Sequence, residues 1–291
     1  MFHAAIPVDT ATALPIVNAM SVDVEEWFQV GAFEHTIDRA DWATLESRVA
    51  DNTARVLDLF AAARVRATFF TLGWVAARQP ALIRRIVAGG HELASHGWDH
   101  RRVFTLGPDA FRTDLAQARA ALEDAGGVRV TGYRAPSFSI DARTPWAHDV
   151  LAEAGYAYSS SVAPVRHDHY GWRHAPRFAW RPRHDSALVE LPVSVARVAG
   201  RQVATGGGFF RLLPAGLTDL ALRQAHAAGQ PGVFYFHPWE VDPGQPRVRH
   251  APLRSRLRHY SRIEAMAPKL AGLLARHRWG RTDAIVAGLA P

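Results

Sequence analysis

Short apolar runs alternate along the chain with longer segments in which apolar residues recur at helical spacing. Most of the runs have the length and the β-prone residues of buried strands, and they predict strands at residues 19–24, 67–73, 91–95, 128–133, 156–160, 188–195 and 232–236. The segments between them predict helices at residues 49–60, 80–87, 108–125, 144–154 and 215–228. Strands that alternate with helices form a mainly parallel sheet, either open or closed into a barrel.

Three stretches fall outside this alternation. Residues 1–17 are expected to form a loose leader, and residues 162–186, rich in His, Arg, Pro and aromatic residues, a long loop. Gly206-Gly207-Gly208 predicts a turn, because no strand leads into the Gly-x-x-x-x-Gly-Lys pattern of a phosphate loop. The 291 residues fit one large α/β domain or two small ones, and length alone does not decide between them.

Composition narrows the class of protein. Hydrophobic residues at 48% and charged residues at 21% are ordinary for a folded protein with a sizeable core. The absence of cysteine excludes disulfides, thiolate metal sites and a cysteine nucleophile. The first twenty residues lack a basic start and a continuous apolar stretch, so a signal peptide is not expected. No run approaches the roughly 18 apolar residues that span a bilayer. We therefore expect a cytoplasmic protein, either free or at the inner face of the membrane.

The net charge of +7 raises the question of a nucleic-acid partner. Of the 34 basic residues only Lys269 is a lysine, and the arginines are scattered along the chain. No basic recognition motif or aromatic-basic RNA signature is present, so nucleic acid is not an expected partner. A basic surface would instead favour an acidic polymer or a membrane-proximal substrate.

Polar residues that can do chemistry stand at the carboxyl ends of separate predicted strands. Asp23 and Glu25 end the first, His96 follows the third, and Arg134 and His237 follow two later strands. Barrels and open α/β sheets both place their active sites at this edge. Each residue also has a structural interpretation, in which His237 is a buried histidine with satisfied hydrogen bonds and Arg134 forms a surface or structural ion pair. The agreement of four strands favours a shared site.

His96 and His100 have the spacing of metal ligands. Two histidines four residues apart can direct both imidazoles at one point, and two His with one carboxylate is a common catalytic zinc set. Asp23 and Glu25 lie on the same side of a strand, so one can bind the metal while the other acts as a base. This pattern predicts a metal-dependent hydrolase. The stretch with His167, His169 and His174 lacks a carboxylate pair on a strand and is not expected to bind a second metal.

The chain resembles the polysaccharide deacetylases of the NodB-homology group, carbohydrate esterase family 4, over residues 18–285. Ser-Val-Asp-Val-Glu-Glu at 21–26 is similar to the first family motif, and His96-Gly-Trp-Asp-His100 matches its His-x-x-x-His metal motif. Gly132-Tyr-Arg-Ala-Pro-Ser137 resembles the Arg-x-Pro motif, and Phe234-Tyr-Phe-His-Pro-Trp-Glu240 resembles the last motif. The chain is more similar to members found with exopolysaccharide and exosortase gene clusters, which carry a C-terminal extension, here about residues 200–285. The resemblance implies a single-domain distorted (β/α)7-type barrel.

The resemblance also implies a role for each matching residue. Asp23 is the expected general base, Arg134 the group that orients it, and His237 the general acid. A divalent metal, expected to be zinc, is implied at His96 and His100. The usual adjacent Asp-Asp pair is replaced here, because Val24 intervenes and Glu25 is the expected third ligand.

Substrate contacts are implied next to these motifs. Ser137 stands where many members have Tyr, so a backbone N–H is expected there for an oxyanion. The expected substrate-binding residues are Trp98, Pro136, Ser137, Phe138 and Trp239. Glu190 is a poor match to the motif whose acid supports the catalytic histidine.

The implied reaction is hydrolysis of N-acetyl groups on N-acetylhexosamine residues, with release of acetate. The expected substrate is an N-acetylated oligosaccharide or polysaccharide, either free or as a lipid-linked precursor. Two other functions stay open: a related-fold amidase that acts on a small or cyclic amide, and a non-catalytic glycan-binding assembly protein. The sequence leaves the glycan, the native metal and the oligomeric state undetermined.

Overall fold

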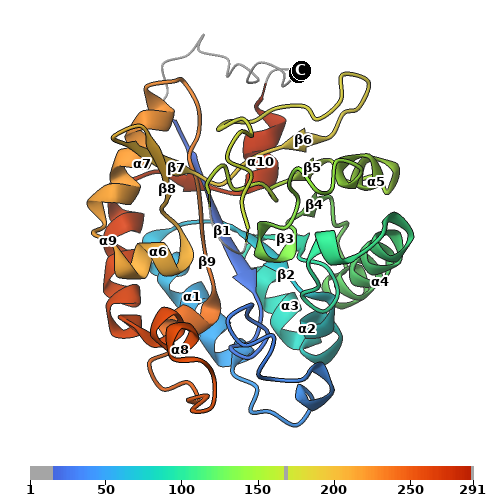
Figure 1. Ribbon diagram of the computed structural model, residues 1–291, viewed down its shortest axis with the longest axis vertical. Coiled ribbons are helices and arrows are strands. Elements are labelled where there is room, and N and C mark those ends of the chain that lie inside the picture. Colours follow the sequence, from blue (N-terminus) through green and yellow to red (C-terminus); the bar gives the residue numbers. More distant parts are fainter. Residues whose placement is uncertain (1–15, 167–169, 290–291) are drawn as a thin grey trace.

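Figure 1 shows the computed structural model, which describes residues 16–166 and 170–289. Residues 1–15 of the predicted leader (residues 1–17) lie outside the described residues. His167 and His169 also lie outside them. Within the described part, no helix has both the length and the apolar character needed to cross a membrane. The cytoplasmic location stays a prediction.

Seven parallel strands pair in the order β9-β1-β2-β3-β4-β5-β6. Their bounds are β1 Asn18–Val24, β2 Thr68–Thr71, β3 Glu92–Ser95, β4 Gly132–Tyr133, β5 Tyr158–Ser159, β6 Val189–Glu190 and β9 Val233–Phe236. The chain after β6 turns back to β9, where the Ser194 N–H donates to the Val233 carbonyl at 3.0 Å. The sheet therefore curls into the expected distorted (β/α) barrel. An eighth short strand, β10 (Trp279–Gly280), pairs with the start of β1.

Helices surround the sheet because each has one apolar face. In α1 (Val49–Ala63), Val49, Val56 and Phe60 are buried, whereas the charged residues Asp51, Arg55 and Asp58 are exposed. The other helices are α2 Gly73–Arg78, α3 Pro80–Ala88, α4 Pro108–Gly126, α5 Ala147–Glu153, α6 Gly207–Leu212, α7 Gly216–His226, α8 Leu253–Tyr260, α9 Met266–Arg276 and α10 Thr282–Ala287. Proline opens α3 and α4, where its missing N–H costs no hydrogen bond.

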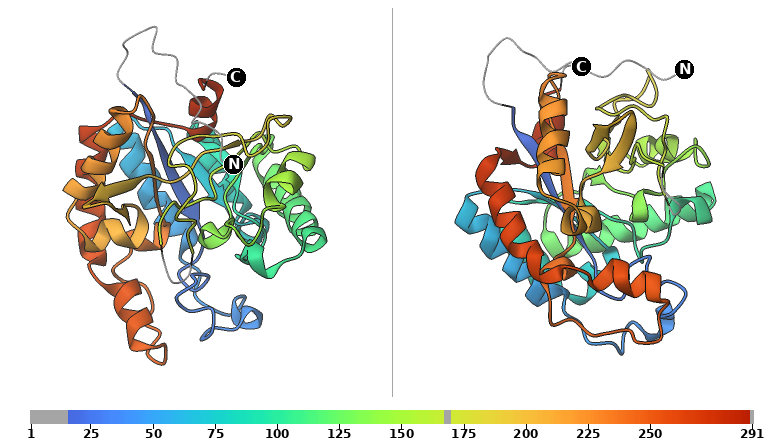
Figure 2. Two further views of the ribbon diagram at one scale, coloured as in Figure 1. Left: turned by 45° about the horizontal axis from the view of Figure 1, so that its top comes forward. Right: turned by 60° about the vertical axis from the view of Figure 1, so that its left-hand side comes forward.

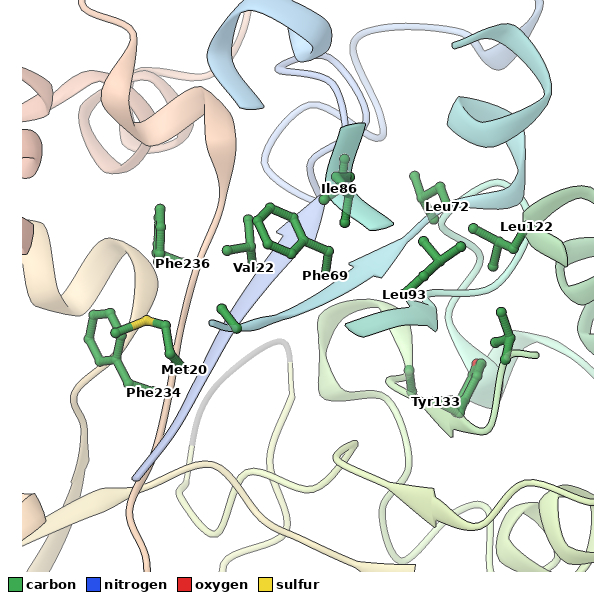
Figure 3. Close-up of a cluster of buried hydrophobic side chains, with 14 of the residues drawn as sticks. Met20, Val22, Phe69, Leu72, Ile86, Leu93, Leu122, Tyr133, Phe234 and Phe236 are labelled. Carbon is green, nitrogen blue, oxygen red and sulfur yellow. The ribbon is translucent and has the colours of Figure 1, made fainter. Parts of the chain in front are cut away.

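The main core lies between the sheet and the helices. Figure 3 shows part of it, in which Met20 and Val22 from β1 pack near Phe69 from β2 and Phe234 and Phe236 from β9. All seven residues of β1 are buried. A strand at the centre of a parallel sheet is covered on both faces, so the apolar residues of β1 are all buried, and its polar residues Asn18, Ser21 and Asp23 are buried with hydrogen-bond partners.

The predicted strands and helices all occur, with shifted ends. The predicted strand 188–195 is wrong in part, because it divides into β6 and the first residue of β7 (Val195–Val198), which pairs with β8 (Arg201–Ala204) in an antiparallel hairpin. The turn predicted at Gly206-Gly207-Gly208 is also wrong, because α6 begins at Gly207. The glycines serve close packing: a Cβ on Gly206 would lie 2.5 Å from the Tyr235 ring.

Candidate metal-dependent active site

A cavity of about 520 Å³ opens at the carboxyl ends of the strands. It is lined by residues from both halves of the chain, including Asp23, Glu25, His96, His100, Ser137 and His237. Figure 1 shows β1 and β2 pointing toward this end of the barrel, which the loop after β1 and helix α8 also border. The strand ends that the sequence marked as polar therefore meet in one place.

Glu25, His96 and His100 form the one group of three or more His, Cys, Asp or Glu side chains within residues 16–166 and 170–289 that can hold a metal ion together. Their ligand atoms all lie within 4.8 Å of one another, and all three residues are buried. Glu25 Oε2 lies 2.8 Å from Nε2 of His100 but makes no hydrogen bond of good geometry. A buried carboxylate oxygen left in this way beside two imidazoles fits a metal ligand.

The neighbours of the two histidines prepare them as ligands. Nδ1 of His96 lies 2.9 Å from the backbone carbonyl of Arg134, and because a carbonyl only accepts, Nδ1 carries the proton and leaves Nε2 free for a metal. His100 has a left-handed backbone with φ +61°. Such a conformation is uncommon for a residue with a side chain and often marks functional sites.

The charges of the site also suit a cation. Burial lowers the pKa of His96 to about 4, so its imidazole is neutral, the form that binds metal. Burial by itself would raise the pKa of Glu25, but the neighbouring His100, His237 and His96 lower it to about 2. A negative carboxylate next to neutral imidazole is the donor chemistry that a divalent metal requires.

Asp23 is held by a fully buried arginine. Arg134 NH1 donates to Asp23 Oδ1 at 2.6 Å and to Ser21 Oγ at 2.8 Å. The other guanidinium nitrogens donate to the carbonyl and the hydroxyl of Ser160. Because every nitrogen of Arg134 has an acceptor, the carboxylate of Asp23 is fixed in one orientation beside the candidate metal ligands.

His237 is held by a second buried ion pair. Its Nδ1 donates to Glu240 Oε2 at 2.9 Å, and Glu240 Oε1 accepts from Arg211 Nε at 2.7 Å. Nε2 of His237 is therefore the nitrogen that faces the cavity, 3.8 Å from Glu25 Oε1. Burial by itself would lower the pKa of His237, but the hydrogen bond to Glu240 and the charge of Glu25 raise it to about 9. A protonated Nε2 can donate a proton into the cavity.

Two known families match the chain one after the other. Polysaccharide deacetylase matches residues 35–159, and Domain of unknown function (DUF3473) matches residues 160–287. The deacetylase match agrees with the resemblance of the sequence motifs to the NodB-homology polysaccharide deacetylases. The boundary between the two matches falls inside the sheet, since β5 ends at Ser159 and pairs with β6 beyond it. Asp23 and Glu25 precede the first match, and His237 lies in the second.

Curated relatives with a deacetylase name match the first part of the chain. The chain is 34% identical to the Chitooligosaccharide deacetylase of Sinorhizobium fredii over 144 residues, 49% of this chain and 60% of the relative. It is 34% identical to the Bradyrhizobium protein of the same name over 110 residues, 38% of this chain and 48% of the relative. The matches thus span about half the length of these curated relatives.

A solved structure from Mycobacterium smegmatis, described as a polysaccharide deacetylase, superposes with a TM-score of 0.65 at 23% identity, over 99% of this chain and 95% of the other. Puue allantoinase superposes with a TM-score of 0.59 at 15% identity, over 99% and 97% of the two chains. At these identities the two structures show the shared fold alone.

The structure separates the predicted substrate-binding residues into two groups. Ser137, Phe138 and Trp239 line the cavity, whereas Trp98 and Pro136 are not among the lining residues. Trp98 instead packs against Gly73, where a Cβ would lie 2.6 Å from its ring. Ser137 and Phe138 have left-handed backbones, with φ +54° and +48°, which is a second strained segment at the edge of the cavity.

Trp239 contacts protein on both faces. Its ring stacks on His237 at 5.2 Å and on His259 at 4.2 Å between ring centroids, and its Nε1 donates to Glu25 Oε1 at 3.1 Å. With 7% of its surface exposed, Trp239 leaves little of its ring for a sugar. Its hydrogen bond to Glu25 gives it a role in orienting a candidate metal ligand.

Sequence reasoning missed the residues that hold His237. In the sequence, Glu240 is only the last residue of the final motif. Arg211 follows Gly206-Gly207-Gly208, for which the sequence predicts a turn. Glu190, the acid considered for this role, instead accepts from the Ser161 and Val162 N–H groups and lies 3.1 Å from His148 Nε2. The spacing of three between His237 and Glu240 was the one available signal.

Proposed function

We propose that this protein is a metal-dependent hydrolase that removes N-acetyl groups from N-acetylhexosamine residues of a polysaccharide or of its lipid-linked precursor. The observation that carries the proposal is the meeting of two carboxylates, two metal-binding histidines and a carboxylate-supported histidine in one cavity. This combination suits an amide hydrolase, which must activate a nucleophile, stabilise an oxyanion and protonate an amine. The deacetylase match and the curated chitooligosaccharide deacetylases support the proposed substrate class.

Each side chain then has one task. Glu25, His96 and His100 hold the metal, which we propose to be zinc from the His₂-carboxylate donor set. When bound, such a metal supplies Lewis acidity at the amide carbonyl and lowers the pKa of a water molecule. Asp23 and His237 remain free of the donor set and serve as base and acid.

The proton transfers follow from the hydrogen bonds. Asp23, with one oxygen fixed by Arg134, takes the proton of the attacking water through its other oxygen. The backbone N–H at Ser137 faces the developing oxyanion in the manner of an oxyanion hole. His237 gives the proton on Nε2 to the departing amine, while Glu240 keeps the imidazole oriented through Nδ1. The C–N bond breaks, and acetate and a free amino sugar leave.

A hydrolase of small or cyclic amides is the second candidate. The same cavity and candidate metal ligands could serve such an amide, and the fold shared with Puue allantoinase is compatible with this alternative. The two candidates differ in the product: the deacetylase releases acetate from an N-acetylated sugar, and the alternative opens a small amide without acetate.

The deciding experiment is acetate release from N-acetylglucosamine oligomers by the purified protein, before and after chelation and zinc re-addition. We expect acetate that disappears with chelator and returns with zinc. Asp23→Asn should lower turnover by about 10²–10⁴-fold, whereas the exposed control Asp109→Asn should leave it unchanged. Metal-independent acetate, or full turnover by Asp23→Asn, would contradict the proposed mechanism. Hydrolysis of allantoin without acetate release from the oligomers would favour the second candidate.

A further inference from the structure

Helix α8 (Leu253–Tyr260) has two large apolar side chains facing solvent. Leu253 is 66% exposed and Leu257 is 58% exposed, the two highest values among the exposed large hydrophobic residues of the described chain. They are four residues apart and so lie on the same face of the helix. Figure 1 and both views of Figure 2 place α8 on the outside of the molecule, at the end where the loop after β1 also lies.

The chain segment around these leucines is rich in arginine. Residues 243–263 contain six arginines and no Asp or Glu. Arg247, Arg249 and Arg256 line a surface groove of about 640 Å³ together with Leu253 and Leu257. All three arginines are exposed, and none forms an ion pair with a carboxylate of residues 16–166 or 170–289. We call Arg247, Arg249, Leu253, Arg256 and Leu257 the α8 patch.

The α8 patch is held rigidly against the catalytic domain. His259, buried at the end of α8, stacks on Trp239, and its Nε2 lies 2.6 Å from Gln245 Oε1. The carbonyls of Arg258, His259 and Ser261 accept hydrogen bonds from Arg211, the residue that also binds Glu240. The exposed leucines are therefore presented by a fixed helix and do not belong to a loose loop.

One helix thus separates the outer groove from the catalytic cavity. Pro252, Ser255, Arg258 and His259 of this segment line the cavity, while Leu253 and Leu257 line the groove on its other side. Whatever binds the α8 patch lies beside the mouth of the cavity.

We propose that the α8 patch docks the protein onto an anionic membrane surface, with Leu253 and Leu257 inserted between headgroups and the arginines bound to lipid phosphates. A helix with leucines on one face and arginines beside them has the chemistry of an interfacial anchor. A soluble acidic glycan offers nothing for the leucines to bind. A second copy of the same patch would bring arginine against arginine, which like charges disfavour. The docked orientation holds the cavity mouth at the membrane, where a lipid-borne substrate is presented.

The test is co-sedimentation of the full chain with vesicles of equal parts phosphatidylcholine and phosphatidylglycerol, compared with vesicles of phosphatidylcholine alone. We expect binding to the anionic vesicles that weakens with added salt. Leu253→Ser with Leu257→Ser should weaken this binding by about tenfold or more. The matched control is Val128→Ser with Val198→Ser, which removes two exposed apolar residues elsewhere. Circular dichroism of each variant checks the fold.

A second pair of variants tests the charges. Arg249→Gln with Arg256→Gln should weaken binding and reduce its salt dependence, whereas Arg84→Gln with Arg85→Gln, exposed arginines on α3, should not. No binding by the wild-type protein, or equal binding by the leucine variant and its control, would overturn the proposal. Complete competition by dextran sulfate with no effect of the leucines would assign the surface to a soluble polyanion instead. The assay needs no turnover, so its result is independent of the proposed activity.

Discussion

The cavity is built by two regions that hold their side chains in different ways. In strands β1 to β4 and the turns after them, the backbone positions the candidate metal ligands: Glu25 follows a central strand, and Nδ1 of His96 donates to the Arg134 carbonyl just after β4. Asp23 is the exception in this region, because its buried ion pair with Arg134 holds it. In residues 160–287, His237 also follows a strand, but buried charges fix it through Glu240 and Arg211. A side chain positioned by the backbone keeps its place when single neighbouring residues are substituted. The position and charge of His237 depend on Glu240 and Arg211, so a single substitution can change them.

The largest effect is expected in the first region. His100→Asn removes a candidate ligand while Asn tolerates the left-handed backbone at this position. We expect loss of bound metal and a decrease in kcat/KM of about 10³-fold or more, because the Lewis acid accounts for several kcal/mol. Metal content per chain and acetate release measure it. His174→Ala, at an exposed histidine, is the control; equal metal content in both variants would remove His100 from the ligand set.

The second region should show a large loss of activity without loss of metal. His237→Ala removes the proposed acid but none of the three candidate ligands. Turnover should fall by about 10²–10⁴-fold, while metal content stays at the wild-type level. If His237→Ala loses its metal, His237 contributes to metal binding, and the acid and the metal ligands do not have separate roles.

A smaller effect should follow from the residue behind His237. Glu240→Gln keeps the shape of the side chain but removes its charge, so the pKa of His237 falls from its raised value. Because the acid must be protonated, activity should be lost at lower pH than in wild type, with kcat down by roughly 10–100-fold and KM little changed.

The chain offers a matched control in its other buried Glu–His pair. Glu190→Gln alters the carboxylate beside His148, which is not among the residues that line the cavity. It should lower thermal stability and leave the pH profile of kcat in place. If both variants shift the profile equally, the effect of Glu240 is general destabilisation.

The smallest effect lies at the opposite end of the barrel and concerns stability. Burial, with the nearby Asp283 carboxylate, raises the pKa of Glu92 to about 7. Since the folded state holds this proton more tightly than the unfolded chain, Glu92 stabilises the fold at low pH and loses that contribution as pH rises from about 4.5 through 7. Denaturant unfolding should show wild type losing about 2 kcal/mol more than Glu92→Gln between pH 5 and pH 8. Parallel pH dependence of the two proteins would refute this.

The pattern of apolar and polar residues along the chain was sufficient to predict the order of most strands and helices. Runs such as residues 19–24 are mainly apolar, with Ser21 and Asp23 as the exceptions, because a central parallel strand is buried on both faces. Such a pattern is recognisable without knowing which strands will pair with it. The elements that were missed or misplaced, including α6, α8 and β10, lie mostly in the last third of the chain. There the glycines pack against Tyr235, and an exposed helix carries leucines on its solvent side, so local patterning misleads.

The sequence by itself determined which residues stand at the carboxyl ends of strands, and so that Asp23, Glu25, His96, Arg134 and His237 face one edge. That edge follows from chain direction alone, because parallel strands end together. Only the tertiary structure decided which acid supports His237, and that Trp239 lies between two histidines. These contacts join residues such as Arg211 and Glu240, which are 29 positions apart, and their pairing depends on how the barrel closes. The periodic pattern of apolar residues within one helix or strand carries no information about how the barrel closes.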